Sequence, residues 1–188
     1  MNVYENCPSF ENDGFILRLA IEGDAQDLLK VYSDKKAAEF FNGDNCHGDN
    51  FYYTTMERME QAVKFWRQAY ENGWFVRWTV IDKISGEAVG TVEEFKRNAQ
   101  DFFNDCGLLR LDLRSGYEES GKIEEILSLI VKPSLEIFGC AMVATKAVPE
   151  AKQRIAALKK LGFMPVNEKL IGFDGEKYGD YYIFKNKK

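Results

Sequence analysis

The chain has 188 residues, of which 45% are hydrophobic, and a formal net charge of −5 at pH 7. This length and apolar content suffice for one hydrophobic core, so we expect a single α/β domain over residues 1–188. The acidic balance argues against nucleic acid as a partner, because binding to a phosphate backbone requires clustered Lys and Arg.

No segment has the pattern of an export signal or a membrane span. Residues 1–10 lack a basic stretch followed by an apolar run. The longest apolar region, 126–138, is interrupted by charged residues and a proline and is shorter than the roughly 20 residues that a span requires. The four cysteines show no CxxC spacing, which favours reduced thiols. We therefore expect a cytoplasmic protein without membrane contact, and no metal site, since His47 lies in a Gly-, Asn- and Asp-rich loop.

The first half of the chain begins with a strand and two helices, followed by strands. Met59, Val63, Trp66 and Tyr70 recur at helical spacing in the second helix. Gly90 lies inside a strand pattern, where a missing side chain indicates a bulge or the close approach of another backbone. The expected elements are a strand at 15–19, helices at 25–32 and 55–72, and strands at 74–81, 88–95 and 108–113, of which 74–81 and 88–95 form a hairpin.

The second half returns to helical periodicity after residue 120. Pro133 is expected to kink or end the first of these helices, because proline lacks an amide hydrogen and its ring is incompatible with a regular helix interior. Gly162 provides a stop for the last helix. The expected elements are a helix at 120–138, a strand at 141–148, a helix at 150–161 and a second hairpin formed by 163–173 and 180–184.

Two local motifs in this order of elements resemble the GNAT superfamily of acyl-CoA N-acetyltransferases. The turn Ile84-Ser85-Gly86-Glu87-Ala88-Val89-Gly90-Thr91-Val92 is similar to the family's hairpin, and Leu158-Lys159-Lys160-Leu161-Gly162-Phe163 is similar to its helix ending. The branch it resembles most acetylates ribosomal proteins and other protein N-termini. The resemblance implies an α/β (α+β) fold with a central mixed, mostly antiparallel sheet that is splayed in the middle and flanked by helices.

The resemblance also implies acetyl-CoA as co-substrate. The strand edge Leu111, Asp112 and Leu113 would bind the pantetheine arm through backbone groups, as an added strand does. The following helix start would hold the pyrophosphate near its backbone amides. Arg154 is a further candidate phosphate contact, with a solvated surface role as the alternative. The residues aligned with the family's phosphate loop are Glu118, Glu119, Ser120, Gly121, Lys122 and Ile123.

This loop departs from the family pattern. Gly121 matches, but Glu118 replaces a Gln or Arg, and Ile123 replaces a small residue. Adjacent carboxylates would weaken diphosphate binding, and Lys122 would compensate in part. The alternative is that Glu118 and Glu119 are acidic residues placed at a helix N-terminus, where the dipole favours them.

The candidate catalytic residues are Glu94, Glu93 and Tyr117. In the family an amine attacks the thioester directly, which requires a proton acceptor and a proton donor. Glu93 and Glu94 are candidate bases, together with Asp112, but strand alternation places the two glutamates on opposite faces, so at most one points into the cleft. A salt-bridged or solvent-facing role is the alternative for each. Tyr117 is a candidate proton donor, as are Tyr181 and Tyr182, with packing as the alternative.

Three functional hypotheses follow. The first is an acetyl-CoA-dependent N-acetyltransferase acting on a small-molecule amine or a protein N-terminus, with homodimerisation left open. The second is a catalytically degenerate GNAT-like binding or interaction module, suggested by the departures in the phosphate loop. The third is an interaction domain that presents the aromatic stretch 51–53 or a sheet edge.

Overall fold

The computed structural model describes residues 2–185. Two short 3₁₀ turns, Glu22–Asp24 and Ser115–Tyr117, precede α1 and α4. The strands are β1 (Phe10–Glu11), β2 (Phe15–Leu19), β3 (Val76–Asp82), β4 (Ala88–Arg97), β5 (Cys106–Leu113), β6 (Met142–Lys146), β7 (Met164–Pro165), β8 (Leu170–Ile171), β9 (Lys177–Tyr178) and β10 (Tyr181–Lys185). The α-helices are α1 (Ala25–Tyr32), α2 (Lys35–Ala38), α3 (Met56–Glu71), α4 (Ser120–Ser128), α5 (Val131–Ile137) and α6 (Lys152–Lys160).

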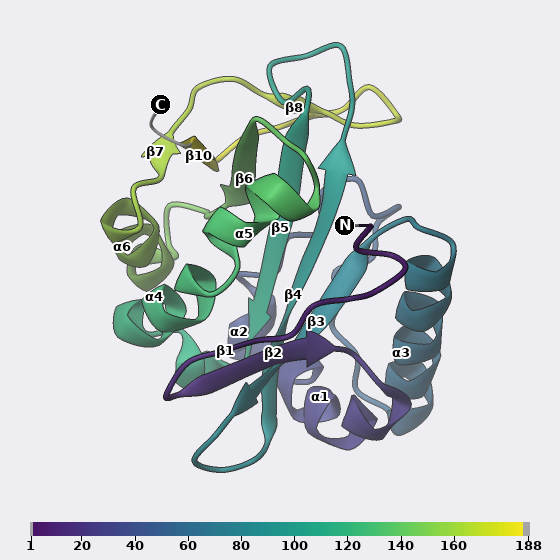
Figure 1. Cartoon of the computed structure of the whole chain (residues 1–188). Coiled ribbons are helices and arrows are strands. Elements are labelled where there is room, and N and C mark those ends of the chain that lie inside the picture. Colours follow the sequence, from purple (N-terminus) through teal and green to yellow (C-terminus); the bar gives the residue numbers. More distant parts are fainter. Residues whose placement is uncertain (1, 186–188) are drawn as a thin grey trace.

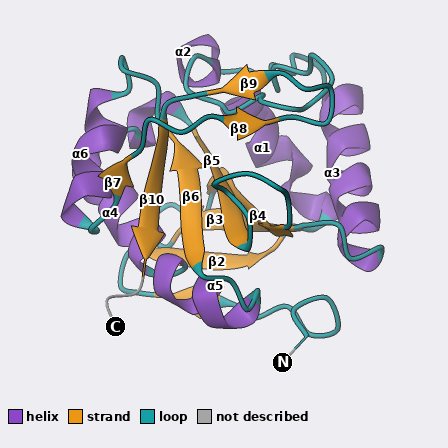
Figure 2. Ribbon diagram, turned by 90° about the horizontal axis from the view of Figure 1, so that it is seen from above, coloured by secondary structure: helices purple, strands orange, loops and turns teal. Residues whose placement is uncertain are grey.

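One twisted sheet forms the centre of the molecule. Its strand order is β1-β2-β3-β4-β5-β6-β10-β7; β5 and β6 run parallel, and the other neighbouring strands run antiparallel (Figure 1). The short strands β8 and β9 form a separate pair. Figure 2 shows this pair on the side of the sheet where α1 to α3 lie, with α5 on the opposite side. The arrangement is the mixed, mostly antiparallel sheet flanked by helices that the sequence predicts.

Apolar side chains fill both sides of the sheet. In α3, the buried residues recur every three or four positions, as a helix with one face on a core requires. This helix begins at Thr55, whose hydroxyl accepts a hydrogen bond from the amide of Arg58 at 3.3 Å. The opposite side is covered by α4 and α6, which pack their apolar faces against the central strands. Both faces of β4 and β5 are therefore largely closed to water.

Most predicted elements are confirmed, and two differ. The predicted helix at 120–138 is two helices, with the break at Leu129 and Ile130 rather than at Pro133. The proline ring clashes with the carbonyl four residues earlier, so the break comes before it. The prediction that 163–173 forms one strand of a hairpin with 180–184 is also wrong. The segment 163–173 contains two short strands, β7, which pairs with β10, and β8, which pairs with β9.

The bulge expected at Gly90 is confirmed. The register between β3 and β4 shifts at Val80 and Ile81, opposite Gly90 and Ala88. A Cβ atom on Gly90 would also collide with the backbone oxygen of Asp112 on β5. Glycine is thus required here because the neighbouring backbone occupies the place of a side chain.

Candidate functional site

The central strands separate at the end of a short parallel pairing. β6 pairs with the first half of β5, in the register Cys106 with Met142 through Leu109 with Thr145. β4 pairs with β5 along its other edge as far as Leu113. Among residues 2–185, no strand pairs with the outer edge of the stretch from Arg110 to Leu113. The splayed edge predicted at Leu111, Asp112 and Leu113 is therefore present; below, we call the gap beside it the slot.

The side chain of Arg154, from α6, lies across this slot. Its Nη1 donates to the carbonyl of Leu111 at 2.9 Å and to the carbonyl of Phe40 at 3.0 Å. Its guanidinium also forms an ion pair with Glu118, and the Arg154 side chain is only 2% exposed. A hollow of about 100 Å³ remains beside this pair and the first turn of α6. The slot is thus narrow, and Arg154 occupies the backbone carbonyl of Leu111 at its edge.

The predicted phosphate loop gathers at the start of α4, next to Arg154. Glu119 is the extended residue before the helix, and its carboxylate receives Lys122 Nζ at 3.1 Å. Apart from Gly121, its two chain neighbours and the backbone of its own helix, no described atom lies within 4 Å of where a Cβ of Gly121 would be, so this position is open. Ile123 is fully buried in the core and its side chain packs beneath the helix. The bulk at Ile123 therefore lies on the core side of α4.

Ser120 connects this loop to α6. Its amide donates to Gln153 Oε1 at 3.0 Å. Its hydroxyl oxygen is buried and has no hydrogen-bond partner in the described part of the chain.

Glu93 lies on the sheet face covered by α1 and α3. Arg77 pairs with its Oε2, and Arg110 donates to its Oε1 at 2.7 Å. Arg77 also reaches Asp112 at 3.0 Å, and Tyr32 donates to the same Asp112 oxygen at 2.8 Å. Burial alone would raise the pKa of Glu93, but the two arginines outweigh it and hold the pKa below its usual value. Glu93 is therefore an ionised carboxylate whose two oxygens are both engaged.

Glu94 points to the opposite face, as strand alternation predicts. Its side chain is fully buried against α5, where Ser134 Oγ lies 2.6 Å from Oε2. Its Oε1 has no partner among residues 2–185. Burial raises the pKa of Glu94 to about 8. This carboxyl group is consequently neutral at pH 7, and it lies on the other side of the sheet from Glu93.

Tyr117 lies near the start of α4, beside the hairpin of β3 and β4. Its hydroxyl donates to Asp82 Oδ2 at 2.5 Å, and Lys122 Nζ lies 4.7 Å from its ring centroid. Burial, followed by this bond to Asp82, raises the pKa of Tyr117. The structure thus brings Tyr117 together with Lys122, and it does not bring Tyr117 together with Glu93 or Glu94.

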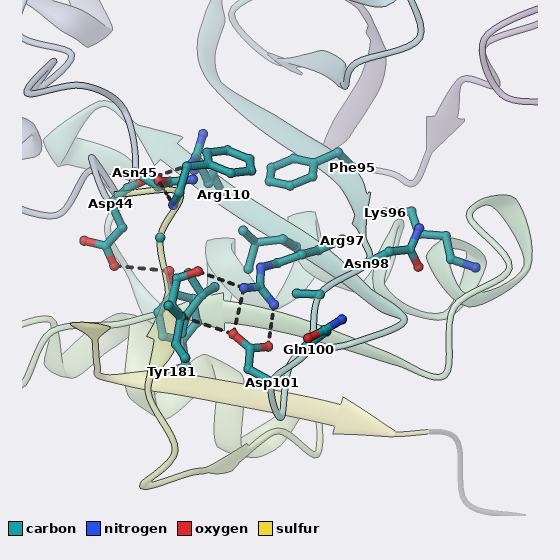
Figure 3. A pocket seen from close by; sticks show the side chains of 16 residues that line it. Asp44, Asn45, Phe95, Lys96, Arg97, Asn98, Gln100, Asp101, Arg110 and Tyr181 are labelled. Atoms are coloured by element: carbon teal, nitrogen blue, oxygen red, sulfur yellow. Dashed lines mark hydrogen bonds and ion pairs between the residues drawn. The ribbon is translucent and has the colours of Figure 1, made fainter. Parts of the chain in front are cut away.

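A pocket of about 490 Å³ is lined by Arg110, which contacts Glu93, so it opens on the same face of the sheet as Glu93. Figure 3 shows this pocket from close by. Its walls come from the loop after α2, the end of β4 with the following loop, β5, β8 and β10. They carry apolar side chains with charged and amide groups between them. The residues that line it include Asp44, Phe95, Arg97, Asp101, Arg110, Leu170, Phe173 and Tyr181.

Asp44 lies in this pocket beside the last residue of β6. Lys146 Nζ donates to its two carboxylate oxygens at 2.7 and 2.8 Å, and the Tyr181 hydroxyl donates to Oδ2 at 3.1 Å. Its backbone carbonyl receives Arg110 Nη2 at 2.9 Å. The sequence does not point to Asp44 or Lys146 as site residues. A related signal is present in β5, where Arg110 and Asp112 alternate with leucines and so place two charged side chains on one face of the sheet.

Within residues 2–185, no helix has the length and apolar character needed to cross a bilayer. A search of curated proteins finds no match.

Several solved structures share the fold at low sequence identity. An acetyltransferase from Salmonella typhimurium that modifies the N-terminal serine of 50S ribosomal subunit protein L7/L12 aligns with a TM-score of 0.66 and 15% identity, covering 94% of this chain and 97% of that one. A ribosomal-protein-S5-alanine acetyltransferase from Vibrio fischeri has a TM-score of 0.68 and 18% identity, covering 94% of both chains. A spermidine N-acetyltransferase from Vibrio cholerae, in complex with CoA and spermine, has a TM-score of 0.64 and 13% identity, covering 92% and 94%.

The sequence also matches a family directly. The model of the acetyltransferase (GNAT) domain matches residues 15–164, which extend from β2 to β7 and include the slot, α4 and α6. With the splayed sheet and the structural neighbours, this match shows that the chain belongs to the GNAT acetyltransferase family.

Proposed function

We propose that the protein is an acetyl-CoA-dependent N-acetyltransferase that transfers the acyl group to an amine by direct attack, within a single domain over residues 1–188. The observation that carries the proposal is the separation of β5 from β6 beside the start of α4. This separation leaves backbone groups of Leu111 and Leu113 without a strand partner in the described structure, next to a helix N-terminus. An extended polar arm ending in phosphates suits such a site.

The residues of the slot fit acetyl-CoA on one condition. Backbone groups of Leu111 and Leu113 would bind the pantetheine arm, whereas the carbonyl of Asp112 faces Gly90 on β4. The open position at Gly121 with Lys122 would receive the phosphates. Arg154 must first leave the carbonyl of Leu111. If a phosphate of acetyl-CoA replaced the Glu118 carboxylate as its partner, the Arg154 guanidinium would stay paired. Arg154 would then have the cofactor-binding role predicted from the sequence.

The neighbouring loop residues have lesser roles in the proposal. Glu119 and Ser120 would shape the loop, and the ion pair with Glu119 partly neutralises the charge of Lys122. Ile123 would support the helix from the core.

The reaction forms a carbon–nitrogen bond and breaks a carbon–sulfur bond, and a proton moves from nitrogen to sulfur. The amine nitrogen bonds to the acyl carbon and loses a proton, and the departing thiolate takes one up. Of the predicted catalytic residues, Glu93 is on the pocket side, and we propose that its charge fixes Arg110 in the pocket wall. Tyr117 stays a predicted proton donor, but its place at the phosphate end and its hydrogen bond to Asp82 support a structural role better. Glu94 stays a predicted base, but its contact with α5 supports a structural role better.

The acceptor in this proposal is a small-molecule amine or a protein N-terminus. The pocket of about 490 Å³ supports either one, since it is concave and combines apolar walls with a few polar groups. The structural neighbours include enzymes for both kinds of acceptor.

Calorimetric titration with acetyl-CoA, combined with a turnover assay against a panel of amines and peptides, tests the proposal. We expect saturable binding and release of free thiol that depends on acceptor. Absence of heat at millimolar acetyl-CoA would defeat the transferase assignment. Binding without turnover for any acceptor would instead support the non-catalytic alternative.

A further inference from the structure

The pocket meets the slot at the point where β5 and β6 separate. Arg110 is the first β5 residue beyond the parallel pairing, and Lys146 is the last residue of β6. Both contact Asp44, Arg110 through the backbone carbonyl and Lys146 through the carboxylate. If the phosphate end of acyl-CoA lies at α4, its acyl end points toward this closed end of the slot. On that arrangement Asp44 would be the pocket carboxylate beside the acyl group, because it contacts both residues that mark the closed end of the slot.

The two carboxylates that line the pocket differ in their remaining capacity for hydrogen bonds. An ionised carboxylate has about four acceptor positions. Asp101 uses four: Arg97 donates to both oxygens at 2.6 and 2.7 Å, and the amides of Phe103 and Ile171 donate at 3.0 and 3.1 Å. Asp101 therefore has no position left for a ligand.

Asp44 has a free acceptor position. Its Oδ2 receives Lys146 and Tyr181, whereas its Oδ1 receives only Lys146 among the described residues. The carboxylate is 11% exposed. Its cationic partner is a lysine, a point charge on a flexible stem, which can shift more readily than the planar fork of an arginine.

We propose that Asp44 binds the amino group of the acceptor, and that the pocket selects an acceptor with a single amine and an uncharged body over a polyamine. This inference rests on the proposed function. The remaining walls support it, because Phe95, Leu170 and Phe173 are apolar. A second ammonium group in this pocket would find no carboxylate with a free acceptor position, since Asp101 already accepts four hydrogen bonds. An uncharged peptide body would meet aromatic and aliphatic side chains.

The test uses two acceptor probes and three variants. The probes are the tripeptide amide Ala-Phe-Ala-NH2, with one amine, and spermidine, with several. Asp44→Asn removes the charge, and Lys146→Gln removes the competing cation. Asp49→Asn is the matched control, because Asp49 lies in the same loop, pairs with Arg58 at 3.0 Å and does not line the pocket. Binding of each probe is measured by NMR titration without acetyl-CoA, kcat/KM is measured with it, and the spectra report whether each variant is folded.

We expect wild-type protein to bind the tripeptide amide more tightly than spermidine. Asp44→Asn weakens tripeptide binding by about tenfold or more, as loss of a hydrogen bond to a charged group does. Asp44→Asn should leave the acetyl-CoA affinity within about twofold, Lys146→Gln should tighten tripeptide binding, and Asp49→Asn should change neither.

Equal tripeptide binding by wild type and Asp44→Asn, or preference of wild type for spermidine, would overturn the inference. If Asp44→Asn does not fold, the test rests on Lys146→Gln. Weaker tripeptide binding by Lys146→Gln than by wild type would then overturn the inference. If wild type binds the tripeptide through Asp44 but does not bind acetyl-CoA, the proposed function fails and the amine site stands.

Discussion

The buried carboxyl group of Glu94 makes the stability of the protein depend on pH. Ser134 Oγ lies 2.6 Å from Glu94 Oε2 and donates to the carbonyl of Ile130 at 2.7 Å. A hydroxyl has one hydrogen, so a protonated Glu94 donates to Ser134 while Ser134 donates to Ile130. An ionised Glu94 would compete with Ile130 for that hydrogen, and no cation among residues 2–185 forms an ion pair with it. Replacement by glutamine, which has the same shape and stays neutral, therefore isolates the effect of this proton.

The sign and size follow from the pKa in the two states. Burial raises the folded pKa to about 8, whereas the unfolded chain has the ordinary value of 4.5. Between these values the folded state holds a proton that the unfolded state has released, so the free energy of unfolding falls as pH rises. Below the unfolded pKa the stabilisation is fully present, and above the folded pKa it is lost. At about 1.4 kcal/mol per pKa unit, roughly 3 kcal/mol is lost from pH 5 to pH 8.

The assay is urea denaturation of wild type and Glu94→Gln at pH 5, 6, 7 and 8. We expect the stability of the variant relative to wild type to rise with pH by roughly 3 kcal/mol across this range. Shared effects of other groups cancel in the difference between the two proteins. A difference that does not change with pH would refute the reasoning, because it would show that Glu94 titrates alike in the folded and unfolded states.

Three further predictions concern neighbouring features. Glu93→Gln should lose about 3 kcal/mol of unfolding free energy at pH 7, because it leaves buried arginines without their partner; a loss below 1 kcal/mol in urea would contradict this. Gly90→Ala should lose about 2 kcal/mol by overpacking, and Gly116→Ala, where a Cβ meets open space, should stay within about 0.5 kcal/mol in thermal denaturation. Glu118→Gln should tighten acetyl-CoA binding about fivefold in calorimetry, because it removes a charge near the phosphates and frees Arg154; weaker binding would argue against the proposed exchange.

The sequence predicts the fold well where hydrophobic periodicity is strong. β2 and α1 have the expected bounds, and α3 and β4 differ by a few residues at their ends. The C-terminal region is less predictable, because distant contacts place β8. Arg97 donates to the carbonyl of Ile171 at 2.9 Å, and Asp101 accepts from its amide. No local pattern in 163–173 encodes these bonds.

The edge of the slot could be predicted because the resemblance to the GNAT family assigns it to residues that are contiguous in the chain. The edge from Leu111 to Leu113 and the start of α4 are a strand and the helix that follows it. The pocket could not, because Asp44 meets Lys146 and Tyr181 from 102 and 137 positions away. In the sequence, Asp44 is one polar residue among the glycines and asparagines of a loop. Its role depends on partners that only the folded sheet brings to it.

The two hydrogen bonds of Arg154 connect the slot with the loop that carries Asp44. The guanidinium holds Leu111 in the slot and Phe40 at the start of the loop that carries Asp44. A ligand that replaces Arg154 at the carbonyl of Leu111 also disturbs the hydrogen bond between Arg154 and Phe40. Such a shared contact makes each ligand change the affinity of the other by the same factor. The affinity for the amine acceptor should therefore differ between the free protein and the protein with acyl-CoA bound.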